Sequence, residues 1–287
     1  MATLQVPSPS PAKWEEADDR FLQRCVFLSI WGPESGGKTT LALTAPGPTA
    51  LLHAAEKISG VYQPFVKRGQ KVRLFNFGFT ASSDEAETAM RARAVWANWK
   101  SLYLDAFTKW AKSIVLDTEP DAWALRRFAK FGSLQPKGDT RDLYSSVNFD
   151  WRQLLKSRFR EQIMGRKCNL ITIHTATDEY KDVVKKNKAG QQVKESQKTG
   201  REKMVGMKEV KYWADVIVYC YKDIMGDGAY HIRIDKAWFN GSVEGTDLTS
   251  EIMAGMDYGQ HPVTKSYLHF ASLMAFITDT PEAEWSK

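Results

Sequence analysis

A glycine-rich run that ends in lysine and threonine lies near the start of the chain. Residues 32–39 read Gly-Pro-Glu-Ser-Gly-Gly-Lys-Thr and fit the pattern G-x-x-x-x-G-K-[ST]. In this pattern the glycines let backbone N–H groups face an anion, and the lysine adds a cation for the β- and γ-phosphates of a nucleotide. A glycine turn with a solvated lysine is the alternative, but it does not explain the two threonines and the apolar helix face that follow. The predicted nucleotide-binding residues are Gly32, Pro33, Glu34, Ser35, Gly36, Gly37, Lys38, Thr39 and Thr40.

The segments around this run have the order that a phosphate-binding loop needs. An apolar stretch of strand length, residues 25–31, precedes it, and Leu41 with its neighbours can open a helix. A second apolar strand, residues 113–116, ends at Asp117. Because hydroxyl and carboxylate oxygens bind Mg²⁺, Thr39 and Asp117 are the predicted metal ligands for ATP with Mg²⁺.

Two glutamates are candidates for the general base that activates an attacking water. Glu56 follows the apolar strand 49–53, so it reaches the sheet edge that also carries the phosphate loop. Glu119 stands two residues after Asp117 and is the rival, and it could instead share the metal. The sequence favours Glu56.

A fourth strand, residues 169–174, ends in the polar pair His174 and Thr175, just before a basic segment. Either side chain could sense the γ-phosphate through a hydrogen bond and pass its presence to that segment. A histidine satisfied at a strand end is the structural alternative.

Positive charge is concentrated between residues 178 and 211, which contain ten lysines and arginines against six acids. Aromatic side chains are scarce there and glycines are scattered through, so the segment cannot pack a core and is predicted to be a mobile basic loop. It is either a solvated insertion or a loop that contacts the phosphates of nucleic acid. The candidate DNA-binding residues in it are Lys185, Lys186, Lys188, Lys198, Arg201 and Lys203.

The composition bounds the class of protein. The 287 residues carry a formal net charge of +6, which permits binding to a polyanion without requiring it. No apolar run approaches the roughly 18 residues of a membrane span, and the N-terminus lacks a signal-peptide pattern. A soluble, cytoplasmic protein without a membrane partner is expected. The three cysteines fall in predicted strands and are expected to be buried free thiols.

Short apolar runs alternate with helical patterns along the chain. The predicted strands are residues 26–31, 49–53, 72–77, 113–116, 169–174, 216–221 and 231–234. The predicted helices are residues 83–112, with its tryptophans in the core, 121–130 and 149–164, and a polar loop is predicted at 132–148. Continuous apolar strands that are covered on both faces indicate an α/β fold with a mostly parallel central sheet flanked by helices.

The phosphate loop resembles that of the RecA family. Residues 32–41 differ from bacterial members of that family only at Gly36, where those members carry serine. The resemblance implies a RecA-type P-loop ATPase core that uses ATP and Mg²⁺, with Glu56 as the catalytic glutamate and Asp117 on the metal. It also implies that the strand before His174 lies between the strands of the phosphate loop and of Asp117.

The RecA family also places a lysine on a late strand that reaches the ATP of a neighbouring subunit, and Lys236 in Ile-Arg-Ile-Asp-Lys matches it. A cation supplied in trans would couple hydrolysis to assembly. A solvated strand lysine is the alternative. The resemblance further implies a first DNA loop at 132–148, with Lys137 and Arg141 as its cations.

The compact arrangement over residues 25–240 is similar to phage-encoded RecA-like ATPases used in single-strand annealing, which share the Trp-Ala-Asp found here at 213–215. That resemblance implies single-stranded DNA as a partner, a homo-oligomer in ring or filament form, a single-strand-binding protein as a further partner, and location in the host cytoplasm. The chain then divides into a lead-in at 1–24, a core at 25–250 and an extension at 251–287 with an acidic tip.

Two other classes of function stay open. One is a P-loop motor or loader that acts on duplex DNA or on a protein partner, which stimulation of hydrolysis by duplex alone would indicate. The other is a non-hydrolysing nucleotide switch or structural ring component, in which Glu56 is not catalytic. The acidic tip, residues 279–284, is read either as a solvated tail or as a segment that docks a partner or competes with DNA for the basic loops.

Overall fold

An eight-stranded sheet forms the centre of the molecule. The computed structural model describes residues 25–54, 58–134, 140–157, 168–186 and 192–286. The strands of the central sheet are β1 (Phe27–Trp31), β2 (Thr49–His53), β3 (Val72–Asn76), β4 (Ser113–Asp117), β5 (Asn169–Ile173), β8 (Val216–Lys222), β9 (Tyr230–Ala237) and β10 (Asp247–Thr249). Their spatial order is β10-β9-β8-β1-β5-β4-β2-β3.

The sheet is mostly parallel. Strands β3, β2, β4, β5, β1 and β8 run parallel to their neighbours, whereas β9 and β10 add an antiparallel edge. The predicted α/β class is confirmed. The expected position of β5, between β1 and β4, is also confirmed, so the ends of these three strands meet at one sheet edge.

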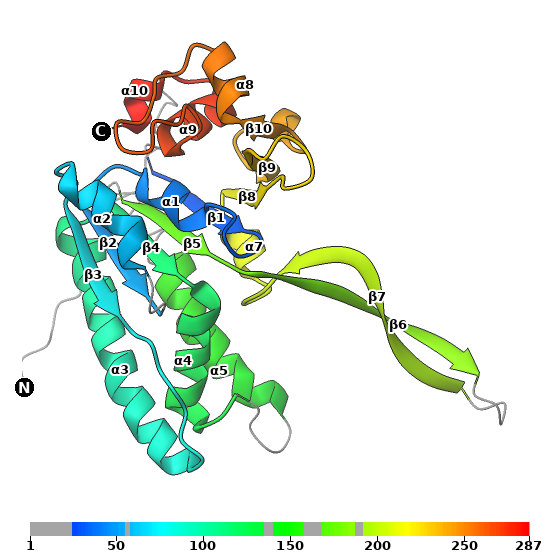
Figure 1. The fold of residues 1–287 in the computed structure, drawn as a ribbon. Helices are drawn as coiled ribbons and strands as arrows, with labels where there is room; N and C mark the ends of the chain where they lie inside the picture. The colour runs from blue at the N-terminus through cyan, green and yellow to red at the C-terminus, as the bar shows by residue number, and fades with distance from the viewer. Residues whose placement is uncertain (1–24, 55–57, 135–139, 158–167, 187–191, 287) are drawn as a thin grey trace, which may run out of the picture.

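Helices cover both faces of the sheet (Figure 1). One face carries α1 (Lys38–Leu43), α2 (Ser59–Lys67) and α9 (Phe270–Thr278). The other carries α3 (Glu85–Asp105), α4 (Glu119–Phe131), α5 (Thr140–Arg152) and α7 (Val210–Trp213). Shorter elements are the π-helical turns at Ala106–Trp110 and Gln153–Ser157, the 3₁₀ turn at Gly241–Val243, and the helices α8 (Ser250–Gly255) and α10 (Glu282–Trp285).

The central strands are mostly apolar because both faces of the sheet are covered there. Every residue of β1, β2, β4 and β5 is buried. Successive side chains point to opposite faces: Leu28 and Ile30 pack with one set of helices, while Phe27 and Trp31 pack with the other. By contrast, β3 is an edge strand and is partly exposed.

The tryptophans of α3 lie in the core, as predicted. Trp99 is fully buried and stacks on Trp96, Tyr103 and Trp151, with ring centroids 4.9, 5.2 and 5.4 Å away. Asp84 caps the start of α3 by accepting hydrogen bonds from the next turn. This aromatic stack joins α3 to α5 and so fixes the helices that follow β4.

The prediction of a mobile loop at 178–211 is wrong for most of that segment. Strands β6 (Ala176–Lys186) and β7 (Gln192–Met204) form an antiparallel hairpin that projects from the body of the molecule (Figure 1). Two paired strands satisfy each other's backbone hydrogen bonds, so the ladder does not require a core. The scarcity of apolar residues excluded a core there, but it did not exclude a hairpin.

The loop predicted at 132–148 is also shorter than expected, because α5 begins at Thr140. Val147, Trp151 and Leu155 are spaced by four residues and are all buried, so they form one apolar stripe on the helix. The stripe includes Val147, which lies before residue 149, where the predicted helix begins. Arg141 therefore lies in α5, although its side chain is outside the described residues. Lys137 lies outside the described residues altogether.

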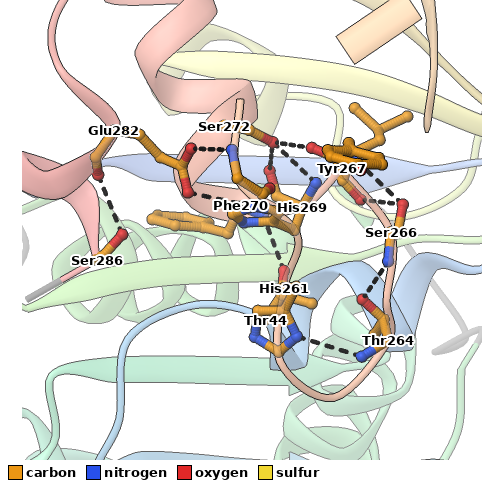
Figure 2. Close-up of polar contacts among 12 residues, drawn as sticks. Thr44, His261, Thr264, Ser266, Tyr267, His269, Phe270, Ser272, Glu282 and Ser286 are labelled. Atoms are coloured by element: carbon orange, nitrogen blue, oxygen red, sulfur yellow. Dashed lines mark hydrogen bonds and ion pairs between the residues drawn. The ribbon is translucent and has the colours of Figure 1, made fainter. Parts of the chain in front are cut away.

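The C-terminal extension packs against the phosphate-loop helix. The buried Thr44, just after α1, accepts a hydrogen bond of 2.8 Å from the backbone N–H of Phe270 (Figure 2). Glu282 in the acidic tip accepts one from the N–H of Gly259, and Trp285 is buried. The reading of the tip as a solvated tail is wrong for Glu282, which holds the extension in place together with Trp285 just beyond the tip, whereas Asp279 and Glu284 are exposed.

Candidate nucleotide-binding site

The phosphate loop lies between β1 and α1 and packs against the end of β8. A Cβ atom on Gly32 would overlap the carbonyl oxygen of Cys220, and one on Gly36 would lie 2.6 Å from it. Ser35 and Gly37 both have positive φ angles, of 61° and 81°. The loop therefore needs glycine at 32 and 36 to approach β8. The serine that bacterial RecA-family members carry at position 36 would not fit this arrangement.

Lys38 is held inside the loop. Its ammonium donates to the carbonyl oxygen of Gly32 at 2.9 Å and to that of Pro33, and the residue is 8 % exposed. Burial lowers the pKa of Lys38 from its ordinary value, and the nearby carboxylate of Asp117 partly opposes this. An ammonium has three hydrogens, so one remains available for a phosphate oxygen in this position.

Thr39 and Asp117 meet, although 78 residues separate them in the chain. The Thr39 hydroxyl donates to the Asp117 carboxylate at 2.8 Å, across the ends of β1 and β4. Burial raises the pKa of Asp117, while the Thr39 hydrogen bond and the Lys38 cation lower it. A hydroxyl and a carboxylate at hydrogen-bond distance are the oxygen donors that Mg²⁺ takes, so these residues fit the predicted ion.

The two candidate general bases, Glu56 and Glu119, differ in what the structure describes of them. Glu56 lies outside the described residues, but the N–H of Ala54 donates to the backbone oxygen of Asp117 at 2.9 Å, so the chain approaching Glu56 runs beside the metal ligand. Glu119 is fully buried and accepts a hydrogen bond from the Trp151 indole. Burial raises the pKa of Glu119 to about 8. A buried carboxyl group that is neutral at pH 7 is poorly suited to take a proton from water.

His174 lies at the expected end of β5, but its ring is engaged within the protein. Nδ1 lies 2.9 Å from the carbonyl oxygen of Val205, and Nε2 lies 3.0 Å from the hydroxyl of Thr172. The carbonyl of Thr175 accepts a hydrogen bond from the N–H of Val205. The ring must release one of these partners before it can bind a phosphate.

The buried ring of His174 predicts a pH dependence of folding. Burial lowers the pKa of His174 to about 4 from the usual 6.5, so the unfolded chain binds a proton between these pH values and the folded chain does not. Stability from this group is complete above pH 6.5 and falls as the pH drops toward 4, by about 3 kcal/mol in all. In His174→Gln that loss should be absent.

The difference in the free energy of unfolding between His174→Gln and the wild type isolates this effect. Urea titrations at pH 7 and pH 4.5 measure it. On going from pH 7 to pH 4.5, the wild type should lose about 2 to 3 kcal/mol more of its free energy of unfolding than the variant does. A difference independent of pH would show that the ring is not held neutral.

A pocket of about 810 Å³ adjoins the phosphate loop. The loop and the start of α1 form one wall, Tyr230 and His231 of β9 form another, and the extension adds residues 264–266. The Tyr230 ring would lie 3.2 Å from a Cβ on Gly37. Sequence reasoning missed this second half of the pocket, because no motif spacing connects residues 230 or 264–266 to the phosphate loop.

Lys236 lies at the opposite edge of the sheet from the phosphate loop of its own chain. It pairs with Ile217 near the start of β8, and its ammonium donates to the carbonyl oxygens of Ala214 and Lys211. It is therefore remote from its own nucleotide site, as a contact in trans requires.

The candidate DNA-binding residues lie on the hairpin where they are described. Lys198, Arg201 and Lys203 are exposed on β7, and Lys198 forms an ion pair with Asp178 at 2.8 Å. Lys185 and Lys186 are in β6, but their side chains are outside the described residues, as is Lys188 altogether. The hairpin starts beside the nucleotide site, since the N–H of Ala176 donates to the carbonyl of Gly32 at 3.0 Å.

The comparisons with known proteins give a likeness in fold alone. No family model matches the chain, and no curated protein matches its sequence. A solved structure described as the RadB recombinase is similar to 78 % of this chain over 86 % of its own, with 13 % identity and a TM-score of 0.42. At these values no residue role is transferred from it.

Two observations bear on the expected properties of the chain. The three cysteines, Cys25, Cys168 and Cys220, are buried thiols that form no disulfide with one another, as predicted. None of the helices in the described residues combines the length and the apolar character that crossing a bilayer takes.

Proposed function

We propose that the protein is a RecA-like, Mg²⁺-dependent ATPase that acts on single-stranded DNA. The observation that carries this proposal is the meeting of Thr39 with Asp117 beside the buried ammonium of Lys38. Oxygen ligands for Mg²⁺ and a cation for phosphate then converge at the carboxyl ends of neighbouring parallel strands. A glycine turn with a solvated lysine would not bury Lys38.

Each residue of the site has a role in this proposal. Lys38 and the backbone N–H groups of the loop hold the β- and γ-phosphates, while Thr39 and Asp117 hold the ion, whose charge offsets that of the phosphates. Glu56 accepts a proton from the attacking water. Lys236 of a neighbouring protomer supplies a further cation, so hydrolysis depends on a ring or filament.

The hairpin supplies the proposed link to DNA. Its exposed lysines and arginine give affinity for phosphates without sequence preference. Ala176, the first residue of β6, donates a hydrogen bond to the carbonyl of Gly32, and the carbonyl of Val205, just after β7, contacts His174. Both ends of the hairpin therefore lie beside the nucleotide site. Promotion of annealing, with a single-strand-binding protein as partner in a host cytoplasm, is the specific activity that we propose.

The hairpin also gives one observation in favour of the motor or loader class. The major groove of B-DNA admits a two-stranded β-ribbon, and β6 with β7 is such a ribbon. Single-stranded and duplex DNA are therefore the two arms of the deciding experiment. Steady-state ATP hydrolysis is measured with Mg²⁺ alone, with a single-stranded oligonucleotide and with duplex of equal length, at low salt.

Stimulation by the single strand supports the proposed function, and annealing assays then follow. Stimulation by duplex alone supports the motor or loader class. Nucleotide binding without turnover under any of these conditions supports the nucleotide-switch class and contradicts the ATPase proposal.

Removing positive charge from β7 should weaken DNA binding without changing unstimulated hydrolysis. We expect Lys198→Gln, Arg201→Gln and Lys203→Gln together to lower single-strand affinity by about 10-fold or more, and to reduce the slope of log K against log salt by up to about 2. Fluorescence anisotropy with a labelled oligonucleotide at several salt concentrations measures both quantities.

The matched control removes three charges from exposed lysines elsewhere: Lys67→Gln, Lys100→Gln and Lys109→Gln. Both triple variants have the same net charge. Equal loss of affinity in the two would assign DNA binding to overall charge and not to the hairpin.

A further inference from the structure

The carboxyl group of Glu119 is a meeting point of four segments. Glu119 is the first residue of α4 and stands two residues after Asp117. Its Oε1 accepts a hydrogen bond of 2.7 Å from the indole N–H of Trp151 in α5. Its Oε2 lies 3.5 Å from Nδ1 of His174, just after β5. The backbone N–H of Met207, three residues after β7, also interacts with this carboxyl group.

Residues 205–207, the root of the hairpin, pack closely against Glu119 and His174. The carbonyl of Val205 faces Nδ1 of His174 at 2.9 Å. Gly206 has a φ angle of 127°, and a Cβ on it would overlap Oε2 of Glu119 and lie 2.9 Å from His174 Nδ1. Residues 205–207 therefore follow the surface of these two side chains, and only glycine fits at 206.

The side chains at the centre of this contact are buried, while Val205 and Gly206 are partly exposed. Glu119 and His174 have no exposed surface, and Met207 is 1 % exposed. Buried polar groups that bond to each other hold their geometry, because breaking one contact leaves a desolvated donor or acceptor. The contact thus fixes where β7 leaves the body of the molecule, relative to the end of β4.

We propose that Glu119 is a positioning residue that fixes the root of the hairpin and the ring of His174 against the end of the strand that carries Asp117. The anchoring itself is independent of the proposed function. The effect of this anchoring on DNA binding rests on the proposed function. When nucleotide binds, a change at Asp117 passes through Thr118 and Glu119 to the packed contacts at residues 205–207, and so alters the affinity of the hairpin for DNA.

Backbone hydrogen exchange at residues 205–207 tests the anchoring without nucleotide or DNA. Glu119→Ala should raise exchange rates there by about 10-fold or more, because Trp151 and Met207 lose the carboxyl that they contact and the His174 ring loses a packing neighbour. Glu119→Gln should stay within about threefold of the wild type, since its amide oxygen still accepts from the indole. The matched control is Asp121→Asn, an exposed carboxyl in the same helical turn. Unchanged exchange in Glu119→Ala would overturn the proposal.

A second variant, changed on the hairpin side of the contact, keeps the test valid if Glu119→Ala does not fold. Gly206→Ala leaves Glu119 intact and forces the root away from it. It should raise exchange at the same amides, whereas Gly245→Ala, at a glycine that also has positive φ but open space around it, should not. Exchange in Gly206→Ala equal to that of the wild type would contradict this close packing.

The activity assay separates positioning from catalysis. With Glu119→Ala, the concentration of single strand that half-stimulates hydrolysis should rise about 10-fold, while unstimulated kcat and the KM for ATP stay within about twofold. A general base at 119 would instead lower kcat by about 100-fold or more in both Glu119→Ala and Glu119→Gln. If the wild type shows no response to DNA, the proposed function fails, and hydrogen exchange still decides the anchoring.

Discussion

Lys38→Ala is expected to weaken binding of ATP with Mg²⁺ by about 100-fold or more, equivalent to about 3 kcal/mol. The ammonium is held by the carbonyl oxygens of Gly32 and Pro33 and has one hydrogen left for phosphate. In a buried site, a cation hydrogen-bonded to a phosphate contributes more than it does in water. Isothermal titration with a non-hydrolysed ATP analogue measures the loss.

The stability of Lys38→Ala is a separate expectation. Burial lowers the pKa of Lys38, so the ammonium is desolvated at a cost that the alanine variant does not bear. The variant should therefore keep its thermal unfolding temperature without nucleotide, but it should lose the increase that nucleotide gives the wild type. Lys67→Ala, at an exposed lysine of α2, is the control. If the nucleotide affinity of Lys38→Ala stayed within about threefold of that of the wild type, the proposal that Lys38 binds the nucleotide phosphates would be wrong.

The centre of the sheet could be predicted from the sequence because its strands are continuous apolar runs bounded by turn residues. The predicted strand 49–53 has the bounds of β2, and every residue of it is buried. The phosphate loop was predictable for a different reason, since only a few residue types allow a backbone to enclose an anion. Both signals are local, so neither needed knowledge of the fold.

The hairpin and the C-terminal wall of the pocket could not be predicted, because their causes are not local. The ladder of β6 and β7 is held by backbone hydrogen bonds that any side chains permit, so composition alone suggested a loop. Residues 264–266 reach the pocket because the extension folds back onto α1, where the Phe270 N–H binds Thr44, which is 226 residues away in the chain. No spacing in the sequence reports such a contact.

The two glutamates show how burial separates residues that sequence cannot. Glu56 and Glu119 both follow apolar strands that end at one sheet edge, so position alone left both open as bases. The stack of Trp99 and Trp151 covers the side of the sheet where Glu119 lies, and Trp151 hydrogen-bonds to it. Glu119 is thereby closed off from water, which a base for hydrolysis must contact.

Glu56→Gln is accordingly expected to bind ATP normally but to lower kcat by about 100-fold to 10,000-fold, the range that a positioned general base contributes. The amide keeps the shape of the side chain but cannot accept the proton of the attacking water. The N–H of Ala54 binds the backbone of Asp117, which brings the chain at 54 beside the metal ligand. Phosphate release under single-turnover conditions measures the chemical step, and analogue binding measures affinity.

Glu119→Gln is the matched comparison, because it makes the same change of charge at the rival position. We expect it to keep kcat within about twofold of the wild type while Glu56→Gln is slow. If Glu119→Gln were slow and Glu56→Gln normal, the buried carboxyl would have to reach water during turnover, and the contacts with Trp151 and Met207 would have to open. Faster exchange of the Met207 amide in the presence of ATP would then be required, so the same hydrogen-exchange measurement distinguishes a fixed anchor from a base that is exposed during the cycle.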